Sequence, residues 1–199
     1  METKEFIKAC HAGDLETAER LLPLADINGS NDHGQGALLT FYSDLTRFLL
    51  SHGADPNSQF NENGSSVLAG LCYVRKLDCV GQLLSAGADP DKGRDESGET
   101  PLHHVFAEDM DIVTALLESG ADPNLKAKVG VISFNYGGDV RVRGETALHR
   151  ACAYGSVDVI EKLLEHGGDL SIRDANGDSA LSWALLHRRE KPIIKLLTQ

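Results

Sequence analysis

The chain has 199 residues, of which 41% are hydrophobic and 25% are charged, and its formal net charge is −11 at pH 7. The composition is that of an ordinary soluble chain. The negative charge argues against nucleic acid as a partner, because phosphate binding requires a concentrated basic surface. Every apolar run is shorter than the roughly 18 residues of a membrane span, so we expect no membrane contact.

The four cysteines, Cys10, Cys72, Cys79 and Cys152, lack CxxC spacing and fall within helical patterns. They are typical of buried core thiols in a reducing compartment rather than of zinc ligands. The first residues, 1–5, carry mixed charge and have no apolar core of a signal peptide. The sequence therefore predicts a cytoplasmic protein without a metal or cofactor.

The N-terminal part of the chain contains two units of a helix–turn–helix pattern. Residues 1–28 predict two short helices around the turn at 11–14. Residues 29–57 are the most degenerate unit, and their stretch 36–57 is about five residues shorter than the corresponding stretch 144–170. We expect the missing residues to come from the end of the first helix of this unit, near Tyr42.

Residues 58–91 and 92–124 repeat the pattern in a regular form. In each, a capping residue opens a first helix, a second apolar helix follows, and a GADP turn closes the unit. The turn glycines Gly87 and Gly120 are 33 residues apart. Each helix is too short to be stable alone in water, so each unit requires a neighbour against which to bury its apolar face.

The next unit, 125–170, contains the clearest copy of the pattern, which runs from Gly144 to Leu170. Thr146 is the predicted helix N-cap, and Gly167 is the predicted left-handed stop. About 14 extra residues precede this copy, given the period. Their alternating aliphatic pattern around Asn-Tyr-Gly-Gly predicts a β-hairpin at 128–143. Residues 171–199 form a closing unit, in which Pro192 opens the last helix.

The period of about 33 residues and the recurring G-x-TPLH and GADPN motifs resemble the ankyrin repeat family closely. The resemblance implies an all-α solenoid of about six helix-pair repeats, forming a single domain over 1–199 with one extended finger at 128–143. It implies protein recognition without catalysis, and we expect a monomer. It also implies that His103 and His149, in the TPLH position, are struts that bond the backbone of the adjacent turn.

The resemblance further implies that finger tips and exposed inner-helix positions bind the partner. Three of the four residues that precede the TPLH threonine position are acidic, and nearby acids extend them into a line, which we call the acidic strip. We expect this strip to face a basic patch of the partner. Its members are Glu96, Glu99, Glu108, Glu145 and Asp178. Aromatic and apolar residues at exposed inner-helix positions are good anchors for a partner; these are Tyr73, Val74 and Tyr154.

The predicted hairpin allows two interpretations. In one, Phe134 and Tyr136 near its tip insert into a partner, and Arg141 and Arg143 pair with the partner's acids. In the other, the finger curls back and buries its apolar residues on neighbouring fingers, because an isolated hairpin is only marginally stable. We favour binding, since exposed apolar groups usually mark contacts.

Two other classes of function remain open. The chain could be an inhibitor or immunity-type protein that blocks a basic enzyme with its hairpin. It could also be an enzyme with a site on the concave face, but no acid–base pair or metal set recurs at workable spacing. The sequence therefore predicts a binding protein that is not an enzyme.

Overall fold

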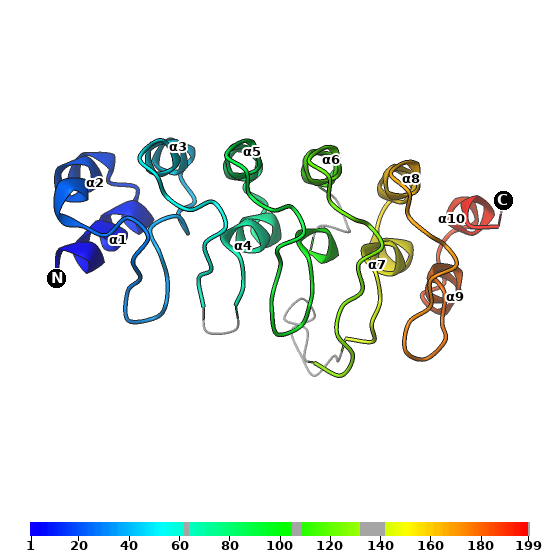
Figure 1. The fold of residues 1–199 in the computed structure, drawn as a ribbon. Helices are drawn as coiled ribbons and strands as arrows, with labels where there is room; N and C mark the ends of the chain where they lie inside the picture. The colour runs from blue at the N-terminus through cyan, green and yellow to red at the C-terminus, as the bar shows by residue number, and fades with distance from the viewer. Residues whose placement is uncertain (62–63, 105–108, 132–141, 199) are drawn as a thin grey trace. The chain divides into compact units, whose positions relative to one another are not determined.

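The computed structural model describes residues 1–61, 64–104, 109–131 and 142–198. The chain divides into two compact units, 1–94 and 95–199, each of which is described by itself. Both are built from short helices joined by turns (Figure 1), and β-pairing among the described residues is confined to isolated bridges. None of the described helices has both the length and the apolar composition needed to span a bilayer.

Unit 1 opens with the helix pair α1 (Glu2–Ala12) and α2 (Leu15–Leu21), followed by the 3₁₀ turn η1 (Leu22–Leu24). α1 buries Phe6, Ile7, Ala9 and Cys10, and it ends at Gly13, whose φ of 81° lies in the left-handed region. The carboxylate of Asp14 then caps α2 by accepting a hydrogen bond of 3.0 Å from the backbone N–H of Thr17. The boundary between the two helices is thus set by a glycine stop, Gly13, and an aspartate cap, Asp14, at adjacent positions, and each residue type favours its role.

Of the two helices predicted for the second repeat, only the second, α3 (Ser43–Ser51), is formed. In place of the first, or inner, helix the chain makes a turn in which Leu39 N donates to Gly36 O at 3.3 Å. The hydroxyl of Thr40 donates to Cys10 O at 2.9 Å, which fastens this turn to the end of α1. The expectation of a first helix shortened only at its end is therefore wrong: the shortening leaves a single turn, which still buries Ala37 and Leu38.

The third helix pair of unit 1 consists of α4 (Val67–Tyr73) and α5 (Leu77–Ser85). The Ser66 hydroxyl accepts from Ala69 N at 3.0 Å and caps α4, as the serine-rich start of the segment predicts. α5 packs against both α4 and α3. Asn57 bridges successive turns, because its side-chain oxygen accepts from Asp89 N at 2.8 Å and its amide donates to Gly87 O at 3.4 Å.

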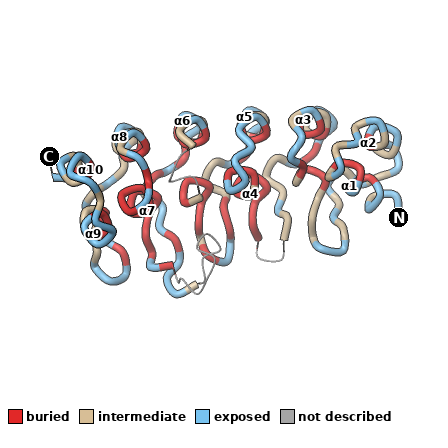
Figure 2. The backbone as a smooth tube through the Cα atoms, turned by 180° about the vertical axis from the view of Figure 1, so that it is seen from behind, coloured by how far each residue is buried: buried red, intermediate tan, exposed pale blue. Residues whose placement is uncertain are grey.

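Unit 2 begins with the 3₁₀ turn η2 (Pro101–His103) and the helix α6 (Met110–Glu118). The remaining helices are α7 (Ala147–Tyr154), α8 (Val157–Glu165), α9 (Ala180–Leu186) and α10 (Lys191–Leu196). α7 packs against α9, and α6 packs against α8. Figure 2 shows α7 almost entirely as buried residues, because all positions from Ala147 to Ala153 are inaccessible. α7 is therefore the centre of this unit.

The ends of the predicted hairpin are described, whereas residues 132–141 lie outside the described residues. Lys128 N donates to Ser97 O at 2.7 Å, and Ala127 N donates to Glu145 O at 3.0 Å. The two ends also bond each other, since Gly130 N donates to Val142 O at 2.8 Å and Val142 N donates to Val131 O at 2.8 Å. The insertion thus leaves and rejoins the scaffold at neighbouring points, beside Glu145.

Candidate protein-binding surface

The core of unit 2 contains an ion cluster made of Glu99, Glu145 and Arg150, all of whose side chains are 0 to 3% exposed. One guanidinium nitrogen of Arg150 lies 2.6 Å from Oε1 of Glu99 and 2.6 Å from Oε1 of Glu145. Arg150 Nε also donates to Glu145 Oε1, at 3.1 Å. We call these three residues the buried ion cluster.

Neighbouring groups satisfy most of the remaining polar atoms of the buried ion cluster. The Ser97 hydroxyl donates to Glu99 Oε2 at 2.8 Å, and Arg143 N donates to Glu145 Oε2 at 2.6 Å. Arg150 Nη1 donates to the carbonyl of His103 at 2.9 Å. Buried charges persist only when they are paired and hydrogen-bonded in this way. The cluster joins the start of η2, the root of the insertion and the middle of α7.

The prediction that the acidic strip is exposed is therefore wrong for two of its members. Glu99 and Glu145 point into the protein, where their charge meets Arg150 rather than a partner. Of the other members, Glu96 is exposed, Asp178 is half-buried and Glu108 lies outside the described residues. Arg150 occupies an inner-helix position that periodicity alone places near the surface, and no signal in the sequence marks it as the buried counter-charge.

The two TPLH-position histidines are the struts that the resemblance implies. Thr100 N donates to Nδ1 of His103 at 3.1 Å, so Nε2 carries the proton and donates to Glu145 O at 3.1 Å. His149 repeats the arrangement, accepting from Thr146 N at 3.3 Å and bonding Asp178 O at 3.2 Å. Burial, followed by the charge of Arg150, lowers the pKa of His103 to about 3. Both imidazoles are engaged in structure, as predicted.

In unit 1, the predicted anchors Tyr73 and Val74 lie at the C-terminal end of α4, and they are 58% and 40% exposed. The structure adds two aromatic side chains that sequence reasoning missed, Phe41 and Tyr42, which are about half exposed. Lys76 Nζ lies 5.8 Å from the centre of the Phe41 ring, which places the two segments side by side. Phe41 and Tyr42 follow the missing inner helix, so no helical periodicity marked them.

In unit 2, the predicted anchor Tyr154 is 39% exposed at the end of α7. Its ring centre lies 4.6 Å from that of His187, in an edge-on arrangement. Arg143, another predicted binding residue, is exposed and places its guanidinium carbon 5.7 Å from the centre of the Trp183 ring. The other predicted residues of the insertion, Phe134, Tyr136 and Arg141, lie outside the described residues.

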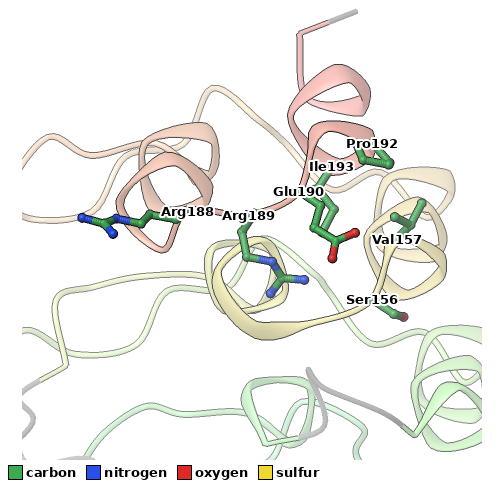
Figure 3. A pocket seen from close by; sticks show the side chains of 7 residues that line it. All are labelled: Ser156, Val157, Arg188, Arg189, Glu190, Pro192 and Ile193. Carbon is green, nitrogen blue, oxygen red and sulfur yellow. The ribbon is translucent and has the colours of Figure 1, made fainter.

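A pocket of about 370 Å³ lies between the turn that follows α7 and the turn that follows α9 (Figure 3). Arg189 and Glu190 turn toward the segment that carries Ser156, whereas Arg188 turns away. Arg189 donates a hydrogen bond to the carbonyl of Gly155, and this bond links the two turns. The lining contains no histidine or cysteine, and its polar groups do not form a nucleophile–base pair.

The described part of the chain contains no cluster of side chains suited to bind a metal ion, and its cysteines are not activated. No group of three or more His, Cys, Asp or Glu side chains there could hold a metal ion. All four cysteines are free and buried, as predicted. Burial raises the pKa of the Cys10 and Cys152 thiols to about 12, so these thiols are protonated and unreactive at neutral pH.

The family described as ankyrin repeats (3 copies) matches residues 37–127 and 129–199. The match covers most of the chain and includes both histidine struts, and the chain belongs to the ankyrin repeat family. Proteins of this family are generally interaction modules rather than enzymes.

Two human relatives carry similar repeats within longer chains. Ankyrin repeat and SOCS box protein 16 is 34% identical over 144 residues, which make up 72% of this chain and 28% of that protein. SH3 and multiple ankyrin repeat domains protein 2 is 29% identical over 163 residues, 71% of this chain and 9% of that protein. The chain thus spans less than a third of either relative.

A solved structure shares the fold over nearly the full length. It is a chain from the complex of the predatory endopeptidase Bd0816 of Bdellovibrio bacteriovorus with the immunity protein Bd3460. The TM-score is 0.77 at 23% identity, with 97% of this chain and 96% of that chain covered. At this identity the similarity establishes the fold.

Proposed function

We propose that the chain recognises a protein partner through exposed apolar side chains at the ends of its inner helices, without catalysing a reaction. The proposal rests on one observation: Tyr73 and Val74 at the end of α4 are exposed although the neighbouring α4 residues Leu71 and Cys72 are fully buried. The core of the helix pair is therefore complete without them. Large exposed side chains of this kind are typical anchors of protein interfaces.

Burial of Glu99 and Glu145 changes the proposed chemistry of the partner. A basic patch on the partner would now meet only Glu96 and Asp178 among the described members of the acidic strip. We therefore base the proposal on the apolar anchors and not on the strip. The proposal retains six repeats, a hairpin at 128–143 that contributes to binding, and a monomer in the cytoplasm.

A second candidate function is inhibition of an enzyme. It is favoured by the similarity of fold to a chain from a complex between an endopeptidase and an immunity protein. An ankyrin stack is rigid, so little conformational entropy is lost when it covers an active site. An activity measurement on the captured partner distinguishes the two candidate functions. An inhibitor abolishes the activity of its captured enzyme at a one-to-one ratio, whereas a scaffold does not.

Affinity capture with the intact chain, followed by titration of the purified partner, tests the proposal. We expect Tyr73→Ala to weaken binding by about tenfold or more, because truncating an aromatic anchor typically costs above about 1.4 kcal/mol. The matched control is Leu24→Ala, since Leu24 of the same unit is 68% exposed but belongs to η1 and not to α4. Equal affinity of the Tyr73 variant and the control would contradict the proposed anchor.

The contribution of the insertion is tested separately. We expect binding to weaken when residues 132–141 are replaced by a two-glycine turn, which suits a tight hairpin and keeps the described bonds between Gly130 and Val142. Unchanged affinity of this variant, with an unchanged melting temperature, would favour the interpretation in which the finger packs on its neighbours.

A further inference from the structure

The end of α7 and the end of α9 carry a cluster of rings with one arginine, which we call the aromatic patch. It consists of Arg143, Tyr154, Trp183 and His187. The Tyr154 hydroxyl and Nε2 of His187 are 3.4 Å apart, and the ring centres of Trp183 and His187 are 6.4 Å apart. The guanidinium of Arg143 lies over the face of the Trp183 ring. A guanidinium over a ring face can still donate its N–H groups to an acceptor that lies in the guanidinium plane.

The charged member of the aromatic patch is Arg143, a cation in a chain that is acidic as a whole. Partial burial, followed by the charges of Arg143 and Arg189, lowers the pKa of His187. Among the described residues, the guanidinium of Arg143 forms no hydrogen bond or ion pair, and it contacts the Trp183 ring.

The carboxylate that bonds the Trp183 ring is already engaged. Asp174 is buried, and it accepts hydrogen bonds from Trp183 Nε1 at 3.1 Å and from the backbone N–H of Asn176 and Asp178 at 2.9 Å each. Its charge is thus held at the edge of the Trp183 ring by three donors. The exposed side of the patch therefore presents an arginine edge and an imidazole, and the arginine has no acidic partner among the residues that the structure describes.

We propose that the aromatic patch accepts an aspartate or glutamate side chain of a protein partner, with the carboxylate on the edge of Arg143 and beside His187. This inference rests on the proposed function and specifies the partner's chemistry at one site. A planar carboxylate matches the bidentate geometry of a guanidinium edge. When Tyr154 donates to Nε2 of His187, Nδ1 carries the proton and supplies a further donor. Leu186, three residues after Trp183 and 64% exposed, offers adjoining apolar surface to a neighbouring residue of the partner.

The patch agrees with the sequence-based expectation that Arg143 pairs with an acid of the partner, and it differs from the basic partner that the acidic strip predicts. From the acidic strip we expected a basic partner, whereas the structure buries the two central acids and exposes Arg143 next to aromatic rings. Electrostatic complementarity fixes register and specificity at interfaces. An acidic side chain flanked by an apolar one is thus the segment that this surface fits.

Trp183 is the only tryptophan in the sequence, so fluorescence of the intact chain reports on the patch. The probes are twelve-residue peptides selected by panning a displayed random library on the intact chain, followed by fluorescence titration of each selected peptide. We expect the selected peptides to share an aspartate or glutamate next to an apolar residue. We further expect Arg143→Gln to weaken their binding by about tenfold or more, as loss of a charge-assisted hydrogen bond does.

Two matched controls make the result specific. Lys195→Gln removes the same charge from an exposed position on α10, and it should leave affinity within about twofold, because isolated exposed charges contribute little. A peptide with glutamine in place of its acid should bind the wild-type chain as weakly as the original peptide binds the Arg143 variant. The Arg143 variant should melt close to the wild-type temperature, since Arg143 hydrogen-bonds the scaffold through backbone atoms and the variant loses only its ring contact with Trp183.

Selection of basic peptides, or equal affinities for the Arg143 and Lys195 variants, would overturn the inference. In either case the proposed function is still supported if the Tyr73→Ala variant binds the captured partner more weakly than the wild-type chain does. Recovery of no peptide together with no captured partner would overturn both.

Discussion

Replacing Arg150 by methionine is expected to lower the free energy of unfolding by about 3 kcal/mol or more, because it leaves two buried carboxylates without their counter-charge. Arg150 is 0% exposed and bonds both Glu99 and Glu145 at 2.6 Å. Methionine fills much of the volume, so the loss reports on charge rather than on a cavity. The measurement is urea unfolding at pH 7 followed by Trp183 fluorescence, which reports on unit 2, the unit that contains the cluster.

Two further variants separate the charge effect from a general loss of packing. In the triple variant Arg150→Met, Glu99→Gln and Glu145→Gln, no unpaired charge remains, and we expect much of the lost stability to return. The control Lys162→Met breaks the surface pair of half-buried Lys162 and exposed Glu165, which are 3.9 Å apart, and it should cost less than about 1 kcal/mol. If the Arg150 and Lys162 variants were equally stable, the buried ion cluster would not hold unit 2 together.

Acidification from pH 6.5 toward pH 4.5 is expected to destabilise the chain. The pKa of His103 is lowered to about 3 in the folded state by burial and by Arg150, whereas an unfolded histidine has a pKa of about 6.5. Between these values the unfolded state binds more protons, so stability is fully present above about pH 6.5 and falls as the pH decreases toward 3. The slope from His103 alone is at most about 1.4 kcal/mol per pH unit.

The structure gives a geometric reason for this sign. Nδ1 of His103 accepts from the backbone N–H of Thr100, so a proton added to Nδ1 would face another donor inside the protein. Burial also lowers the pKa of His149, which adds a contribution of the same sign. Carboxylates with lowered pKa, such as Asp14, lose their contribution only below about pH 4, outside this window.

The variant His103→Gln should show a shallower pH dependence of the unfolding free energy between pH 6.5 and 4.5, although its stability at pH 7 is lower. Adding His149→Gln should flatten the dependence further. Urea midpoints at intervals of half a pH unit provide the measurement. A slope in the His103 variant equal to that of the wild-type chain would show that this histidine is not held neutral by the fold.

The sequence predicted those parts of the fold that depend on local chemistry. Glycines at helix ends adopt the expected left-handed conformation, including Gly53, Gly87, Gly120 and Gly167, because a residue without Cβ enters that region at little cost. The TPLH-position histidines also behave as predicted, since the motif carries both the threonine and the ring that bond each other. Membership of the ankyrin repeat family followed from these recurring positions.

The sequence did not predict which charged residues are buried. Glu99 and Arg150 are 51 residues apart, and each occupies a position that is exposed in a single isolated repeat. Only the packing of one repeat on the next removes them from water, and no periodicity within either repeat encodes that event. The prediction therefore failed where burial depends on pairing between repeats.

The second repeat shows the same limit for backbone structure. Its length indicated a shortened inner helix, but the short segment cannot complete a hydrogen-bonded helix and forms a turn fastened by Thr40 to Cys10 O. Helix nucleation is costly over so few residues. The exposed rings of Phe41 and Tyr42 follow from that turn, and they were missed for the same reason.

Carboxyl labelling of the native chain with a carbodiimide and an amine, read by mass spectrometry residue by residue, distinguishes the scaffold acids from the surface acids. Glu99 and Glu145 should remain unmodified, whereas the exposed Glu96 should be modified readily, and all three should react after unfolding in urea. If Glu99 and Glu145 were modified as fast as Glu96 in the folded chain, both residues would lie at the surface. The buried ion cluster would then not exist, and the acidic strip would again be the better candidate for binding a partner.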